Sequence, residues 1–135
     1  MTALDSFPAH GNDVHSTLGI TVVKADKDEV IMSVPVGPKV HQPFGILHGG
    51  VSALIAESAA SFAGQLNVPA GKAVVGTELN CSHLRSMRDG VLTATARPIR
   101  VGRTLHVWGI ELRDEQGREI CVARCSLAVI DVPTA

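Results

Sequence analysis

The chain has 135 residues, enough to bury the core of one domain and too few for two ordinary ones. Hydrophobic residues make up 45% of it and charged residues 19%, a globular profile that excludes an intrinsically disordered chain. The net charge of −1 argues against a general nucleic-acid-binding protein, and no apolar run approaches the roughly 18 residues that a membrane span requires.

The first predicted segment is polar and comprises residues 1–17, which we expect to be mobile, and residues 18–135 are expected to form the single domain. Neither the basic nor the apolar region of a signal peptide occurs in the N-terminal stretch MTALDSFPAHGNDVH, so a cytoplasmic protein is expected. Two stretches rich in β-branched residues follow at 18–25 and 29–36. A charged turn separates them, and together they predict a β-hairpin.

A helix is predicted next, from residue 49 to residue 66, because this stretch is rich in Ala, Leu and Ser and is about five turns long. Extended stretches then occupy residues 73–85, 90–101 and 103–132, and the turn DEQG divides the last into two strands. Apolar and polar residues alternate along 90–101, as in a half-buried sheet. The order of two strands, one helix and four strands predicts an α+β fold, in which a long antiparallel sheet wraps over one apolar helix.

One carboxylate interrupts this apolar helix, Glu57 in the stretch QPFGILHGGVSALIAES. No other Asp, Glu, Lys or Arg occurs between Lys39 and Lys72, so local ion pairing does not explain Glu57. Either Glu57 faces water or it has a catalytic role. Its small apolar neighbours along the helix would partly desolvate the carboxylate and make it a better proton acceptor.

The start of the helix offers a second functional group. If the helix begins at Gly49, the free N–H of Gly49 and the positive end of the helix dipole form a donor for an oxyanion. Glu57 lies eight residues further, about 12 Å away at 1.5 Å per residue, so one carbonyl group cannot meet both. Two antiparallel helices related by a twofold axis would solve this, which predicts a homodimer with shared active sites. Ser61 would join that site from one turn beyond Glu57.

Three segments carry a family resemblance: QPFGILHGGVSALIAES, VVGTELNCSHLRSMRDG and HVWGIELRDEQGR. The combination of QPFG, HGG and a Glu eight residues after the first Gly of that pair resembles the hotdog-fold thioesterases, in which a curved antiparallel sheet wraps a central helix. Within that family the chain is similar to the phenylacetic-acid-degradation branch. That branch includes the 4-hydroxybenzoyl-CoA thioesterases of the Arthrobacter type and the 1,4-dihydroxy-2-naphthoyl-CoA thioesterases of menaquinone synthesis.

The resemblance implies hydrolysis of an acyl-CoA, with an aromatic acyl group, to the free acid and CoA. It makes Glu57 the general base or the nucleophile, and Gly49 the N–H donor to the thioester carbonyl. Gln42 and His48 would orient the thioester, and Ser61 stands where relatives have Ser or Thr. Contacts with the substrate or CoA are implied for Phe44, Gly50, Arg85, Ser86, Gly102, Arg103 and Thr104. The resemblance also implies a homotetramer built as a dimer of dimers.

Alternatives remain open for several of these residues. Five arginines against one acid between residues 85 and 103 indicate either an anion site or ordinary solvent-facing strand positions. A hotdog-fold acyl-CoA-binding protein, or a hydratase or dehydratase in which His48 pairs with Glu57, is the competing function. The other histidines lack metal-ligand spacing, so no metal and no cofactor are expected. The cysteines and the His106/Trp108 pair are interpreted as packing residues.

Overall fold

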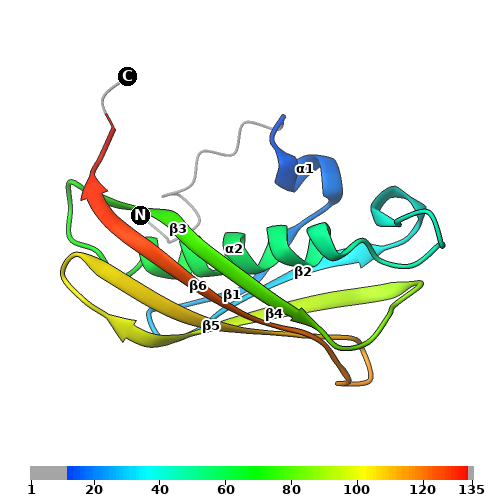
Figure 1. Cartoon of the computed structure of the whole chain (residues 1–135). Helices are drawn as coiled ribbons and strands as arrows, with labels where there is room; N and C mark the ends of the chain where they lie inside the picture. The colour runs from blue at the N-terminus through cyan, green and yellow to red at the C-terminus, as the bar shows by residue number, and fades with distance from the viewer. Residues whose placement is uncertain (1–11, 134–135) are drawn as a thin grey trace.

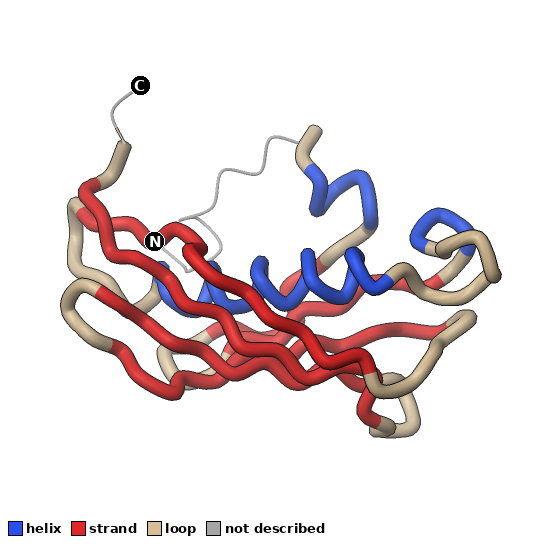
Figure 2. Tube along the Cα trace, viewed as in Figure 1, coloured by secondary structure: helices blue, strands red, loops and turns tan. Residues whose placement is uncertain are grey.

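The protein is described by a computed structural model that covers residues 12–133, and it consists of one antiparallel sheet and one long helix, preceded by a short one (Figures 1 and 2). In chain order the elements are α1 (Val14–Leu18), β1 (Thr21–Ala25), β2 (Val30–Val36), the 3-10 turn η2 (Pro38–Val40), α2 (Gly49–Gln65), β3 (Lys72–His83), β4 (Gly90–Val101), β5 (Leu105–Arg113) and β6 (Glu119–Asp131).

The six strands form one sheet in the order β1-β2-β4-β5-β6-β3, and every neighbouring pair is antiparallel. The predicted hairpin is confirmed as β1 paired with β2. The helix α2 lies along one face of the curved sheet and packs against β2, β3, β4, β5 and β6 (Figure 1). This confirms the predicted α+β fold, a long central helix wrapped by an antiparallel sheet.

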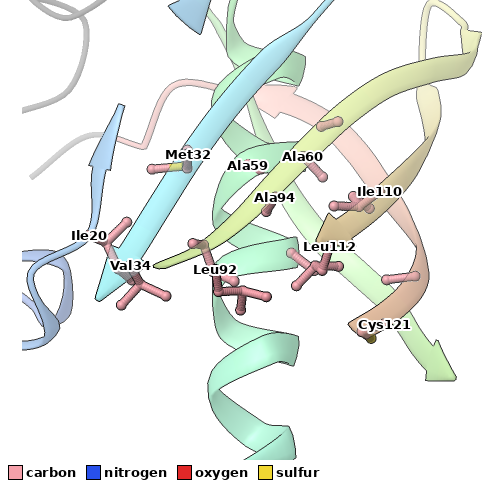
Figure 3. Close-up of a cluster of buried hydrophobic side chains, with 14 of the residues drawn as sticks. Ile20, Met32, Val34, Ala59, Ala60, Leu92, Ala94, Ile110, Leu112 and Cys121 are labelled. Carbon is pink, nitrogen blue, oxygen red and sulfur yellow. The ribbon is translucent and has the colours of Figure 1, made fainter. Parts of the chain in front are cut away.

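Small side chains let α2 approach the sheet closely. Ala59 and Ala60 of α2 are fully buried, and Ala94 of β4 is fully buried in the same cluster (Figure 3). Larger side chains such as Ile110 and Leu112 of β5 fill the remaining space without solvent exposure. Because facing alanines leave little room, larger residues at these positions would overpack the core.

The start of α2 is held by its own cap and by the preceding loop. The Nδ1 atom of His48 accepts the backbone N–H of Gly50 at 2.7 Å, so His48 is the N-cap and the helix begins at Gly49 as predicted. The backbone N–H of His48 donates to the carbonyl of Val40 at 2.9 Å, and that of Leu47 donates to Met87 at 2.7 Å. These bonds fix the loop that carries the first turn of the helix.

The helix α1 is an element that the sequence analysis did not anticipate. Its residues 14–17 belong to the segment expected to be mobile, and Leu18 to the first predicted strand. Most of the segment expected to be mobile, residues 1–11, lies outside the described range. Asp13 caps α1 by accepting the N–H of Ser16 at 3.0 Å, and Gly19 ends it in the left-handed region with φ 78°. An Asp followed six residues later by a Gly was therefore the available signal.

The packing residues behave as predicted with one exception. His106 and Trp108 of β5 are fully buried, as are Cys121 and Cys125 of β6. Burial raises the pKa of the Cys121 thiol to about 12 and that of Cys125 to about 11. Cys81, on the edge strand β3, is only half-buried. The two buried thiols are protonated at neutral pH and are poor nucleophiles, which fits a packing role.

Candidate active site

The first turn of α2 leaves one backbone donor unused. The N–H of Gly50 donates to the His48 side chain, and that of Val51 donates to the His48 carbonyl at 2.9 Å. Within residues 12–133 no hydrogen-bond acceptor is positioned for the N–H of Gly49. Gly49 therefore offers the free N–H at the positive end of the helix dipole, while the N–H of Gly50 is already engaged.

A pocket of about 390 Å³ opens at this end of the helix. Gly49, Arg85 and Ser86 all line it, so the structure brings together three of the predicted site residues. The other lining residues are Ile46, Leu47, Ser52, His83, Leu84, Met87 and Ile120. The pocket thus joins the first turn of α2 to the loop between β3 and β4.

Two predicted residues of the preceding loop have distinct environments. The side-chain carbonyl of Gln42 accepts the backbone N–H of Phe44, which leaves the amide NH₂ of Gln42 as a donor. The side chain of Phe44 is 84% exposed, although it is large and apolar. An exposed Phe in a loop is suited to contact a ligand or a second subunit.

Two imidazoles flank the free N–H of Gly49. Because Nδ1 of His48 accepts a backbone N–H, its neutral ring holds the proton on Nε2 and can donate from there. The ring of His83, the last residue of β3, lies so close to Gly49 that an added Cβ there would be 3.0 Å from its Nε2. Sequence reasoning grouped His83 with structural histidines. Its position in VVGTELNCSHLRSMRDG, one of the three segments that carry the resemblance, was the only signal for it.

Glu57 lies in a separate groove of about 430 Å³ that α1, α2 and the edge strand β3 line. The other lining residues are Val14, His15, Ala53, Leu54, Ser58, Ser61 and Leu79. Its carboxylate lies against Gly76 of β3, where an added Cβ would be 2.9 Å from Oε2. Glu57 is exposed in the single chain, so the expected desolvation by its own helix neighbours is not present. Ile55, Ala56, Ala59 and Ala60 are buried in the core, whereas Glu57 is exposed beside the edge strand β3.

The turn Gly102–Thr104 lies far from Arg85 and Ser86. Arg85 and Ser86 precede β4 and the turn follows it, so the 12 residues of β4 separate them (Figure 1). At about 3.3 Å per residue the separation is up to about 40 Å along the strand. One chain alone cannot bring both groups to one ligand molecule. The Oε atoms of Glu57 and the N–H of Gly49 likewise face different pockets.

The arginines divide into two classes. Arg97 pairs with Glu29 at 2.8 Å and with Glu111 at 3.8 Å, so it occupies an ordinary solvent-facing position on the sheet. In the part of the chain that the structure describes, Arg85 and Arg103 make no ion pair with a carboxylate. Their guanidinium groups remain available to an anion.

Neither a metal-binding cluster nor a membrane-spanning helix occurs among the described residues. No group of three His, Cys, Asp or Glu side chains between residues 12 and 133 is arranged to hold a metal ion. None of the helices in that range has the length and apolar character needed to cross a membrane.

Comparison with known proteins yields consistent matches. Residues 44–121 match the family model described as "Thioesterase superfamily". A 1,4-dihydroxy-2-naphthoyl-CoA hydrolase of Listeria monocytogenes is 41% identical over 116 residues, covering 86% of this chain and 94% of that protein. The proofreading thioesterase EntH of Cronobacter sakazakii is 42% identical over 113 residues, covering 84% of this chain and 82% of that protein. The solved structure of thioesterase HI1161 of Haemophilus influenzae superimposes with a TM-score of 0.91 at 40% identity, covering 99% of this chain and 94% of that one.

Proposed function

The chain belongs to the thioesterase superfamily and is a thioester hydrolase, and we propose that its substrate is an acyl-CoA with an aromatic acyl group, such as 1,4-dihydroxy-2-naphthoyl-CoA or a hydroxybenzoyl-CoA. The relative from Listeria monocytogenes, named for hydrolysis of an aromatic CoA thioester, supports this choice. The structural observation that most supports thioester hydrolysis at this site is the free N–H of Gly49 at the start of α2.

We propose that the thioester carbonyl accepts this N–H, so that negative charge developing on its oxygen is stabilised by the helix dipole. The Nε2–H of His48 and the side-chain NH₂ of Gln42, both in the loop before α2, remain free as donors and orient the thioester. Glu57 then either removes a proton from the attacking water or attacks the carbonyl itself to form a mixed anhydride. Both routes end in free acid and CoA, and both require Glu57.

Gly49 and Glu57 act on one carbonyl only if they come from different chains. β3 is an edge of the sheet and is 12 residues long, and an unpaired edge strand readily pairs with another strand. Pairing of two β3 edges about a twofold axis would set the two α2 helices antiparallel, with Gly49 of one chain near Glu57 of the other. It would also cover the exposed Glu57. We expect such dimers to associate further into a homotetramer.

The same dimer accounts for the two distant sets of CoA contacts. Arg85 and Ser86 share the pocket of Gly49, and the Arg103 turn lies at the opposite end of the sheet. In an antiparallel dimer the Arg103 turn of one chain lies at the end where the partner places Arg85. We propose that unpaired arginines from both chains bind the CoA phosphates.

Release of free thiol from a panel of CoA thioesters tests this function. Glu57→Ala and Glu57→Gln are expected to lose nearly all turnover, and Glu57→Asp is expected to be impaired because its carboxylate is one methylene short. Asp28→Asn, which removes an exposed carboxylate in the β1–β2 turn, is the matched control and should be fully active. Wild-type turnover in Glu57→Ala would refute the mechanism, and binding of acyl-CoA without thiol release would refute the function.

A further inference from the structure

The groove beside Glu57 has one wall that comes from outside the helix and sheet. Val14 and His15 of α1 line it, and α1 lies over the face of α2 that points away from the sheet (Figure 1). The Nε2 atom of His15 and the hydroxyl of Ser58 form a hydrogen bond of 2.8 Å, which joins residues 43 positions apart. α1 is thus fixed directly beside the carboxylate.

This wall combines an apolar surface with unused hydrogen-bonding groups. The side chains of Val14, Leu54 and Leu79 supply the apolar part. His15 is half-buried, and the Ser58 bond occupies only one of its two ring nitrogens, while no partner for the other lies within residues 12–133. An entirely apolar ligand packed against this nitrogen would displace water from it and leave it unsatisfied, which costs free energy.

The charges around the groove restrict the ligand further. Glu57 is the one carboxylate that lines it, and no Lys or Arg of the described chain is among the lining residues. An anionic substituent would therefore be repelled by Glu57 without a compensating cation from the groove residues of the same chain. A neutral group that exchanges hydrogen bonds, such as a hydroxyl, satisfies His15 without that penalty.

We propose that α1 selects the acyl group: Val14 packs against an aromatic ring, and His15, held in place by Ser58, hydrogen-bonds a neutral hydroxyl substituent on that ring. This inference rests on the proposed function, because it requires that the acyl group lie beside Glu57. The groove volume of about 430 Å³ falls in the range of ligand pockets, roughly 300 to 1,000 Å³. α1 thus adds two specificity-determining residues, Val14 and His15, to the proposed acyl site.

The test compares pairs of thioesters that differ by one hydroxyl group, namely benzoyl-CoA against its 2-, 3- and 4-hydroxy derivatives. For at least one isomer the wild-type protein should show a kcat/KM about five- to tenfold above that of benzoyl-CoA, the size expected for one neutral hydrogen bond. His15→Phe keeps a ring but removes both nitrogens, so this ratio should fall close to one.

Two further variants make the result decisive. Ser16→Ala, on the same helix but outside the groove, should keep the wild-type ratio. Ser58→Ala removes the hydrogen bond that holds His15 and should lower the ratio. This variant tests the inference even if His15→Phe does not fold. An unchanged ratio in both variants, an equal loss with all four thioesters, or a wild-type protein without any hydroxyl preference would overturn the inference. In each of these outcomes the wild-type protein still releases thiol in a Glu57-dependent reaction, whereas failure of the proposed function abolishes thiol release by the wild type or its dependence on Glu57.

Discussion

Gly76 provides the space that the Glu57 carboxylate occupies, and filling that space should stop catalysis without unfolding the protein. A Cβ added at Gly76 would lie 2.9 Å from Oε2, 3.1 Å from Cδ and 3.5 Å from Cγ of Glu57. Ordinary contacts between such atoms are about 3.5 to 4 Å, so in Gly76→Ala the carboxylate has to move by about 0.5 to 1 Å. A displacement of about 1 Å at a reacting group typically costs on the order of 100-fold in rate.

The stability effect should be small, because the obstructing atoms are the far end of a flexible and exposed side chain. Replacing Gly by Ala on a strand reduces the conformational freedom of the unfolded chain and contributes about 0.4 to 1 kcal/mol of stability where the backbone permits it. We therefore expect kcat to fall about 100-fold and Tm to change by less than about 4 °C. Gly37→Ala is the matched control, since no atom lies within 4 Å of its added Cβ and its backbone is extended.

The assay follows thiol release under saturating acyl-CoA, together with thermal unfolding of both variants. Wild-type kcat in a folded Gly76→Ala protein would refute the reasoning, because the carboxylate cannot both move and keep its catalytic geometry. A large loss of stability would also count against it, since it would mean that Gly76 is required by the sheet and not by Glu57.

Three more results are expected. Mixing inactive Glu57→Ala with inactive Gly49→Val under conditions of subunit exchange should restore about a quarter of wild-type activity, because half of the dimers are mixed and each has one intact site; no recovery in verified mixed dimers would place the site within one chain. Arg85→Ala should raise KM for acyl-CoA more than it lowers kcat, whereas Arg97→Ala should leave KM unchanged. An equal change of KM in both variants would mean that Arg85 does not bind the CoA phosphates. Burial lowers the pKa of His106 below its usual 6.5, so the unfolded chain takes up the proton first and the free energy of unfolding should fall as the pH drops below about 6.5. Urea titrations from pH 8 to 5 should show this fall in wild type and a smaller one in His106→Leu, and identical slopes would contradict it.

Much of the fold follows from local patterns. The Ala-rich run after HGG is helical from Gly49 to Gln65, and the alternating stretch after Asp89 is the strand β4, Gly90–Val101. Such regularities depend on residues three or four apart in a helix and two apart in a strand, so they are visible without the partner elements. The helix α1 was missed because its five residues are too few for a periodic signal, and only its caps mark it.

The candidate site also combines features that follow from the sequence with features that depend on tertiary structure. The sequence by itself determines that Gly49 and Glu57 lie on one helix about 12 Å apart, since the rise per residue is a constant of the helix. Only the tertiary structure decides that His83 lies against Gly49, that Gly76 leaves room for Glu57 and that His15 bonds to Ser58. Each of these contacts joins residues far apart in the chain, and it depends on strand register and on how α1 packs. A one-residue change of register would turn the side chains of β3 to the opposite face, so no local pattern around His83 or Gly76 contains that information.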